Sequence, residues 1–324
     1  MTEVIGKQRQ GAKPAGQASR GIFLVANKNS AEHCHNLIFS IRECGCRLPI
    51  RIIPYGGEPL VLNPELELDD VRTLAVEDFP AEGQAFVAEL GRRMPMCSPG
   101  LLARFLAWFG EFDEFLYTDN DIVAMMNWEE LFPYLADYEL VNADWEYQTK
   151  GIFNMQQPAR FEELMGAEAL EQAITAGHFL CRREAHQTED LLRAVAWMEE
   201  HREVPKWHDQ ALLLIAVVLG KWKTLNLCKA PHHWASSWAG DYRNLFDVVR
   251  TIQTKRQPLS HLHYSGGAPT GAGPVEELLF ANLPVQERNR KLLSALAIES
   301  SGVGRVKRKV RREWKKVARK LGSK

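Results

Sequence analysis

The fold is decided by one stretch of the sequence, Phe115-Leu116-Tyr117-Thr118-Asp119-Asn120-Asp121-Ile122-Val123. Its first half is a short apolar run rich in aromatic residues, which is typical of a buried strand. The run ends in two carboxylates, Asp119 and Asp121, where the C-terminal edge of a strand opens into a crevice. Alternation along an extended chain would point both carboxylates the same way, so the two could reach one hard divalent cation. Asn120 would face elsewhere. Since Asp and Asn are also common in turns, a plain polar turn is an equally good reading of the triplet alone.

The segments on both sides of this stretch alternate between strand and helix patterns. Residues 21–26 and 50–55 are apolar runs typical of buried parallel strands, and residues 31–44 between them have helical spacing. Further strands are expected at 71–74, 138–142 and 177–181, and further helices at 101–109, 128–135, 189–200 and 209–219. The alternation predicts an α/β fold with a mostly parallel sheet and helices on both faces.

Composition divides the chain into four parts. The 324 residues are 45% hydrophobic and 25% charged, which is ordinary for a soluble globular protein. Residues 1–20 have almost nothing to bury and are expected to be a disordered leader. The predicted main domain is 21–275, followed by a helical extension at 276–303 and a basic tail at 304–324. The six cysteines, with no signal peptide, indicate reduced thiols in the cytoplasm.

Two motifs carry a resemblance to a known family. Asp119-Asn120-Asp121 resembles the DxD motif of nucleotide-sugar-dependent glycosyltransferases with the GT-A fold. Leu262-His263-Tyr264-Ser265-Gly266 resembles the late His-aromatic-x-Gly motif of the glycogenin and lipooligosaccharide galactosyltransferase family. Between them, Arg104 in residues 98–108 and the segments 175–180 and 208–210 resemble that family's intermediate landmarks. The resemblance spans about residues 21–270 and is loose outside the motifs.

This resemblance implies a GT-A, Rossmann-like sheet and a metal-dependent glycosyltransferase that retains anomeric configuration. The donor would be a nucleoside diphosphate sugar and the acceptor a glycan or a lipid-linked glycan. The implied metal ligands are Asp119, Asp121 and His263, with His261 left open as the competing histidine. Two carboxylates and an imidazole suit Mn²⁺ better than Mg²⁺, which stays possible.

The remaining site residues also follow from the resemblance. Gln210 and Asp209 would lie beside the anomeric carbon as the catalytic pair, although Asp209 is equally suited to cap the helix that follows it. The implied substrate-binding residues are Asn27, Arg104, Asn120, Thr175, Gly177 and Gly266. The aromatic segment 222–242 is a candidate acceptor platform, with one or two of its rings at most assigned to a ligand.

Three positions depart from the family pattern, and two other functions stay open. The family usually has Asn where Thr175 stands, a second Asp where Ala211 stands, and a Lys where this chain has Gly267-Ala268-Pro269. An apolar strand followed by Asp119, Asp121 and Val123 also matches the nucleophile motif of haloacid-dehalogenase-like phosphatases. A catalytically inactive GT-A domain that only binds its ligand is the third possibility.

The tail predicts where the protein acts. From Arg305 onward there are eleven Lys or Arg residues and one acidic residue, Glu313. The apolar residues Val306, Val310 and Trp314 recur at helical spacing, so the tail is expected to be a basic amphipathic helix. It would bind an anionic membrane surface from the cytoplasmic side, as a peripheral protein. A solvated tail, nucleic-acid binding and packing on the acidic body were the competing readings, and no nucleic-acid partner is expected.

Overall fold

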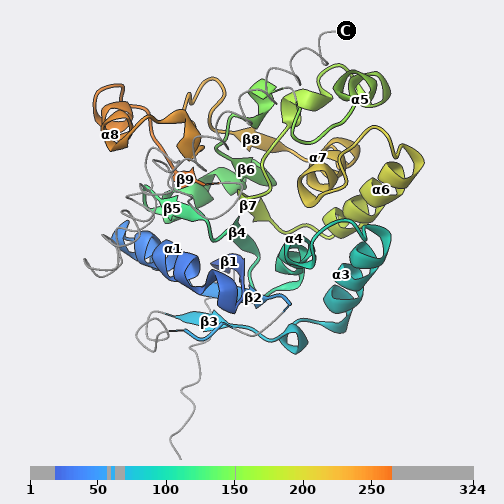
Figure 1. Ribbon diagram of the computed structural model, residues 1–324, viewed down its shortest axis with the longest axis horizontal. Helices are drawn as coiled ribbons and strands as arrows, with labels where there is room; N and C mark the ends of the chain where they lie inside the picture. Colours follow the sequence, from blue (N-terminus) through green and yellow to red (C-terminus); the bar gives the residue numbers. More distant parts are fainter. Residues whose placement is uncertain (1–18, 57–59, 63–69, 150, 265–324) are drawn as a thin grey trace, which may run out of the picture.

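A seven-stranded sheet with the order β3-β2-β1-β4-β7-β6-β8 forms the centre of the protein (Figure 1). This computed structural model describes residues 19–56, 60–62, 70–149 and 151–264. The strands are β1 Arg20–Ala26, β2 Ile50–Pro54, β3 Val71–Thr73, β4 Glu114–Thr118, β6 Leu140–Asn142, β7 His178–Arg182 and β8 Thr224–Asn226. All neighbours are parallel except β7, which runs antiparallel to both β4 and β6.

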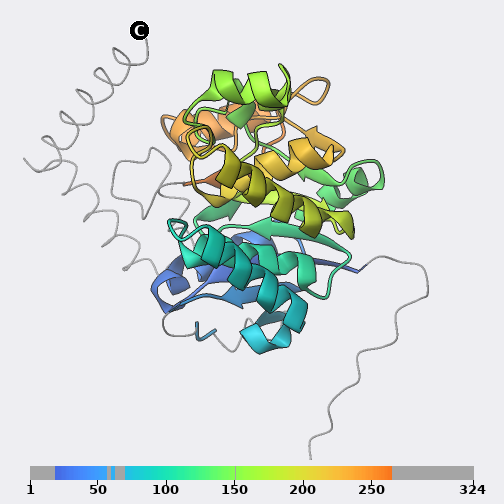
Figure 2. The ribbon, with the colours of Figure 1, turned by 90° about the vertical axis from the view of Figure 1, so that its right-hand side faces the viewer.

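Helices cover both faces of this sheet (Figures 1 and 2). On one face, α1 (Ala31–Glu43) and the 3-10 helix η4 (Trp128–Ala136) pack on Ile22, Leu24 and Leu116. On the other face, α3 (Ala81–Arg93), α4 (Pro99–Ala103), the 3-10 helix η3 (Arg104–Phe109), α6 (His186–Glu200) and α7 (Asp209–Gly220) bury the alternate side chains, such as Phe23 and Phe115. The two cores follow from the two-residue repeat of each strand. Each large apolar side chain contributes about 1.5–3 kcal/mol on burial.

A second, two-stranded antiparallel sheet joins distant parts of the chain. Strand β5 (Ile122–Ala124) follows β4 at once and pairs with β9 (His261–His263), with Ile122 opposite His263. Helix α5 (Pro158–Met165) and helix α8 (Leu245–Gln253) lie outside the central layers (Figure 1). The pairing of β5 with β9 places residues late in the chain beside the end of β4.

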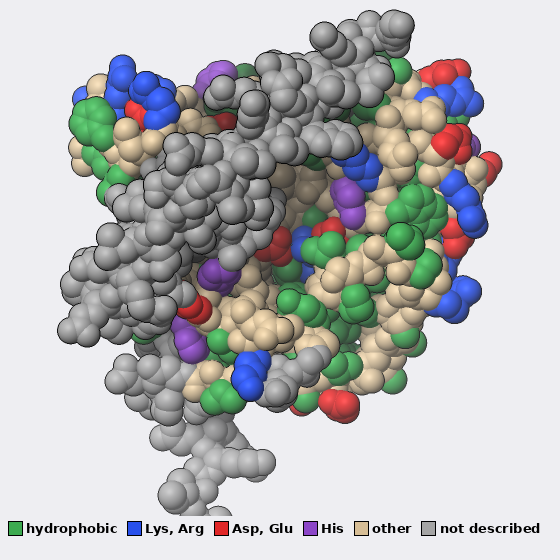
Figure 3. Space-filling view, viewed as in Figure 1, with side chains coloured by type: hydrophobic (Ala, Val, Ile, Leu, Met, Phe, Trp, Pro, Cys, Tyr) green, Lys and Arg blue, Asp and Glu red, His purple; other side chains and the backbone are tan. Residues whose placement is uncertain are grey.

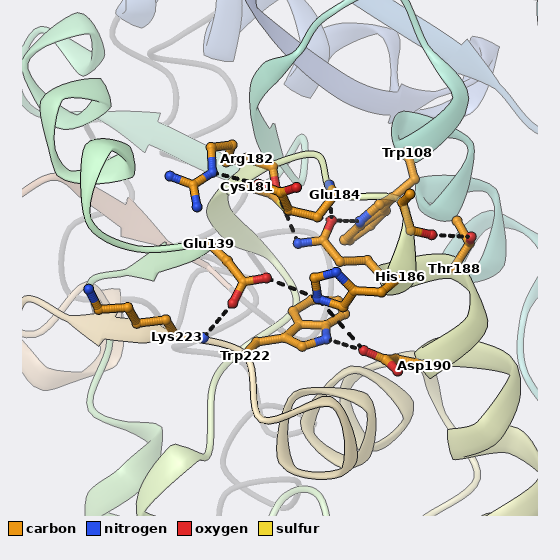
Figure 4. Close-up of polar contacts among 12 residues, drawn as sticks. Trp108, Glu139, Cys181, Arg182, Glu184, His186, Thr188, Asp190, Trp222 and Lys223 are labelled. Carbon is orange, nitrogen blue, oxygen red and sulfur yellow. Dashed lines mark hydrogen bonds and ion pairs between the residues drawn. The ribbon is translucent and has the colours of Figure 1, made fainter.

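A buried polar network anchors α6 to the sheet (Figure 4). The Gln187 side chain accepts from the Trp108 indole (2.9 Å) and donates to the carbonyl of Arg182 (3.0 Å). Asp190 accepts from the Trp222 indole at 2.7 Å. Because these polar groups are buried with their partners, the network fixes where α6 lies relative to β7.

The predicted α/β sheet is confirmed, with local differences. The strands predicted at 21–26, 50–55, 71–74, 138–142 and 177–181 all form, within one or two residues at most ends. The helix predicted at 101–109 is instead a short α4 continued by a 3-10 helix, and the segment 128–135 is also 3-10, with Pro133 inside it. Helix α3 was missed. Gly266, the extension 276–303 and the tail 304–324 lie outside the described residues. Within the part of the chain that the structure describes, no helix is both long and apolar enough to cross a bilayer.

Candidate active site

The site lies where the order of the strands reverses. Strand β1 has β2 on one side and β4 on the other, so the crossovers leave β1 in opposite directions. A crevice opens outside the carboxyl ends of the strands at such a point. Asn120 joins the two strand ends, because its Nδ2 donates to the carbonyl of Val25 at 2.9 Å.

Three side chains converge at this crevice. Asp119 and Asp121 follow β4, and His263 comes from β9, which pairs with β5. One ligand atom from each of the three lies within 4.8 Å of the other two. His263 Nε2 is 3.3 Å from Asp121 Oδ1. Two carboxylates and one imidazole at these separations fit one divalent cation.

Asp119 is oriented by two donors. Its Oδ1 accepts from the Tyr117 hydroxyl at 2.9 Å and from Arg104 Nη2 at 3.1 Å. The guanidinium of Arg104 is buried, lies over the Tyr117 ring, and also pairs with Asp209 at 2.8 Å. Since Oδ1 is fully engaged, Oδ2 is the oxygen that Asp119 can offer to a ligand.

The charges of the triplet are set by burial and by near neighbours. Burial raises the pKa of Asp119, and Arg104 offsets only part of that effect. Burial opposes ionisation of Asp121 too, but the His263 imidazole outweighs it and lowers the pKa of that carboxyl. Likewise, the Asp121 carboxylate outweighs burial and raises the pKa of His263. The pair Asp121 and His263 is therefore poised to be charged until a cation takes the place of the imidazole proton.

Gly177 gives these side chains the space that they occupy. A Cβ at this position would lie 2.4 Å from His263 Cε1 and 3.0 Å from Asp119 Oδ2. Any side chain there would displace the imidazole from the carboxylates.

The competing histidine, His261, is placed differently. Its ring stacks on His178, with ring centroids 3.8 Å apart, and its Nδ1 bonds Ser260 Oγ. Burial lowers its pKa well below the ordinary value. Of the two histidines in β9, His263 is the one that lies with the carboxylates.

Two cavities meet at this cluster. The β1–β4 cavity, about 190 Å³, has Val25, Tyr55, Ser98, Gly100, Leu101, Arg104, Tyr117, Asp119, Asn120 and Asp121 in its walls. The aromatic cavity, about 410 Å³, is walled by Asp144, Trp145, Glu146, Gln148, Thr149, Phe153, Thr175, Gln210, Ser236, Ser237, Trp238, Asp241 and His263. Acidic, basic and histidine side chains gather around a hollow near the middle of this face of the molecule (Figure 3).

Comparisons with known proteins bear on the fold. No protein-family model matches the sequence, and no match is found among the curated proteins. Among solved structures, the bifunctional glycosyltransferase WbbM is similar over 87% of this chain, with 14% identity and a TM-score of 0.53. The chain spans about half the length of WbbM, 53%. The chain has the GT-A glycosyltransferase fold.

Two further solved structures with lower TM-scores are similar to the chain. The galactosyltransferase LgtC, solved with donor and acceptor sugar analogues, has 15% identity and a TM-score of 0.47, with 85% of this chain and 95% of LgtC covered. The glycosyltransferase GlyE of Streptococcus pneumoniae TIGR4 has 15% identity and a TM-score of 0.47, with 86% of this chain and 64% of GlyE covered.

The aromatic cavity of this GT-A domain contains residues that the sequence analysis missed. Trp145 and Phe153 come from the segment after β6, and Phe153 meets Trp238 edge to face at a centroid distance of 6.4 Å. All three rings are at least 38% exposed. In the predicted platform 222–242, Trp238 lines the cavity, whereas Trp222 and Trp234 are buried in the core. Trp145 stands between two acidic residues, Asp144 and Glu146, and this pattern is the signal that could have revealed it.

Two buried acids stand in the wall of the aromatic cavity. Asp144 Oδ2 accepts from Thr175 Oγ1 at 3.0 Å and from Asn142 at 2.8 Å. Glu146 Oε1 accepts from Asn154 at 3.1 Å. Burial, with the nearby Asp144 charge, raises the pKa of Glu146 to about 8. Glu146 is therefore a carboxylic acid that stays largely protonated near neutral pH.

The other predicted site residues fall into two groups. Thr175 and Gln210 line the aromatic cavity. Asp209 begins α7 and is buried against Arg104, and Asn27 caps the 3-10 helix Lys28–Ser30 by accepting from Asn29 at 3.0 Å. Neither Asp209 nor Asn27 lines either of the two cavities.

Proposed function

We propose that the protein is a metal-dependent glycosyltransferase, which moves a sugar from a nucleoside diphosphate sugar to a glycan or lipid-linked acceptor. The observation that carries this proposal is the convergence of Asp119, Asp121 and His263 between two cavities of a GT-A domain. The donor would lie in the β1–β4 cavity and the acceptor in the aromatic cavity. Sugars pack their apolar faces on aromatic rings such as Trp145 and Trp238.

The three convergent side chains would hold a divalent cation. When bound, the cation stabilises the negative charge that develops on the leaving diphosphate. A site with one imidazole among its ligands suits Mn²⁺ better than Mg²⁺, which prefers oxygen ligands alone, so Mn²⁺ is the first choice and Mg²⁺ the second.

The protein's own residues would make two contributions to this site. Arg104 and Tyr117 hold Asp119 in one orientation, and Asp209 holds Arg104, so Asp209 is a positioning residue in this scheme. Gln210, in the aromatic cavity, would lie beside the transferred sugar. Its amide oxygen would stabilise an oxocarbenium-like state on the face from which the acceptor arrives, with retention of configuration.

The substrate would be bound by polar groups around the metal ligands. Asn120 and Arg104 border the β1–β4 cavity, and Thr175 borders the aromatic cavity. Gly177 leaves room for His263 and Asp119 beside the donor. Asn27 is assigned to the nucleobase, and Gly266, outside the described residues, to the donor, by the sequence resemblance alone.

Donor turnover is the test of this function. The purified chain would be incubated with nucleoside diphosphate sugars, with Mn²⁺ and then with EDTA, and released nucleoside diphosphate measured. Release that depends on Mn²⁺ supports the proposal. Donor binding without release would indicate an inactive GT-A domain. Hydrolysis of a simple phosphate monoester with no donor turnover would favour the phosphatase alternative.

We also propose that the basic tail, 304–324, binds the inner face of an anionic membrane and brings the cytoplasmic enzyme to a lipid-linked acceptor. Each cation near such a surface contributes about 1 kcal/mol, and salt weakens the attraction. Co-sedimentation with anionic and neutral liposomes tests it, comparing the full chain with one that ends at Gly304. Equal pelleting of the two chains, or equal binding to both lipids, would assign the tail to another partner.

A further inference from the structure

A third cavity adjoins the aromatic cavity. This basic cavity, about 240 Å³, lies against α8 and has Arg243, Arg250 and Lys255 in its walls. It shares Trp145, Ser236 and Asp241 with the aromatic cavity. A molecule that lies on Trp145 in one cavity can therefore extend into the other.

The charges of the two cavities differ in sign. The aromatic cavity has carboxyl groups in its walls and no Lys or Arg among the described residues that line it. The basic cavity has three cations and two carboxylates, Asp241 and Asp247. Arg243 and Asp247 neutralise each other in a two-point pair, with separations of 2.8 and 3.0 Å, and Asp241 accepts from Ser236.

Two cations are left without such a partner. Arg250 and Lys255 are exposed and form no ion pair with any of the residues that the structure describes. Both carry only donors, so what binds between them must supply acceptor oxygens and negative charge. Arginine and lysine together are well suited to a phosphate group.

We propose that the basic cavity binds a phosphate group of the acceptor, whose sugar ring lies against Trp145 in the aromatic cavity. This inference rests on the proposed glycosyltransferase function. The acceptor is then a phosphorylated sugar, either free or as the headgroup of a lipid. The phosphate is held at α8, while the hydroxyl that receives the new sugar points toward His263 and Gln210 across the shared residue Trp145.

Calorimetric titration with glucose 6-phosphate and with unphosphorylated glucose, in the absence of Mn²⁺, tests the site directly. The variants are Arg250→Gln and Lys255→Gln. Arg256→Gln is the matched control, since it removes the same charge from a neighbouring position outside the cavity walls. Each cavity variant is expected to weaken glucose 6-phosphate binding about tenfold, while the control leaves it unchanged. Measurable glucose 6-phosphate binding that is equally tight in all three variants, or that unphosphorylated glucose matches, would overturn the inference.

A second experiment distinguishes a soluble sugar phosphate from a lipid headgroup as the source of the phosphate. Co-sedimentation with phosphatidate and phosphatidylcholine vesicles is compared between the Arg250→Gln and Arg256→Gln variants of the full chain, in which the basic tail contributes equally. Weaker phosphatidate binding by Arg250→Gln than by Arg256→Gln, without glucose 6-phosphate binding by the unmodified protein, assigns the site to a lipid headgroup. Glucose 6-phosphate binding that Arg250→Gln weakens, with equal phosphatidate binding by the two variants, assigns it to a soluble sugar phosphate. The absence of both effects overturns the inference.

The donor site provides the control that separates this inference from the proposed function. The Asp121→Ala variant should bind glucose 6-phosphate as the unmodified protein does, because Asp121 lies outside the basic cavity. If the donor is turned over but phosphate binding is unchanged in the Arg250→Gln and Lys255→Gln variants, only this inference is overturned. Phosphate binding that needs both cations, without any donor turnover, overturns the proposed function and leaves the phosphate site standing.

Discussion

The carboxyl groups of the β1–β4 cavity and those of the aromatic cavity have different partners. Asp119 and Asp121 face cationic partners, Arg104 and His263. Asp144 and Glu146 are held by neutral donors, and burial raises the pKa values of both. In the proposed scheme, the cationic partners in the first cavity suit a charged donor with its cation, and the neutral donors in the second suit a hydroxyl-rich ring.

The largest expected effect comes from removing a carboxylate of the β1–β4 cavity. Asp121→Ala or Asp119→Ala should reduce Mn²⁺-dependent release of nucleoside diphosphate by about 1000-fold or more, because each variant removes a ligand of the cation. Asp137→Ala, at an exposed position, is the control. Circular dichroism checks that the fold persists. Near-normal turnover by both variants would remove the metal assignment.

A substitution in the aromatic cavity should lower the rate of transfer rather than the affinity for the donor. Gln210→Ala is expected to lower kcat about 100-fold with little change in the donor KM, since its amide acts on the transition state. Gln148 borders the same cavity, so Gln148→Ala tests whether any truncation in this cavity lowers kcat. Equal losses of kcat in both variants would mean that Gln210 has no specific role in transfer.

The two histidines of β9 test which imidazole belongs to the proposed metal site. His263→Ala should weaken Mn²⁺ binding by about tenfold or more, because it removes one of three ligands. His261→Ala, two residues away on the same strand, should lower thermal stability and leave Mn²⁺ affinity unchanged, because its ring packs on His178. Calorimetric titration of Mn²⁺ into both variants decides it, and equal or reversed losses would mean that the wrong histidine was chosen.

The last prediction concerns the pH dependence of stability, which Glu146 in the aromatic cavity should control. The pKa of Glu146 is raised from 4.5 to about 8, so between these values the folded protein holds a proton that the unfolded chain has released. The free energy of unfolding should therefore fall as pH rises from 5 to 8, by about 3 kcal/mol. Glu146→Gln should remove this part of the slope, and Glu168→Gln, at an exposed position, should not. Urea unfolding at several pH values measures it; parallel slopes in all three proteins would contradict the assignment.

The sheet and the closeness of Asp119 to Asp121 could be predicted because their signals are local. A buried strand such as β1 is a continuous apolar run, and the pair Asp119 and Asp121 follows directly on another. His263 was within reach of the sequence because its motif repeats a known pattern, although only the pairing of β5 with β9 separates it from His261.

The acceptor side was harder to predict, because its residues have no periodicity in common. Trp145 and Phe153 lie in an irregular segment, where exposure depends on tertiary packing. The raised pKa of Glu146 arises from burial beside Asp144, and the pairing of Arg104 with Asp209 joins η3 to α7. Neither can be read from spacing. Helix α3 was missed because its apolar residues are few and two glycines interrupt it.

The pairing of β5 with β9 also has a consequence for the order of synthesis. The carboxylates of the centre emerge from the ribosome with β4 and β5, whereas the imidazole arrives only with β9, near the end of the described chain. Domains fold as units while the chain is being made, and contacts between distant segments form last. In the proposed scheme, a growing chain would therefore bind Mn²⁺ less tightly until β9 docks.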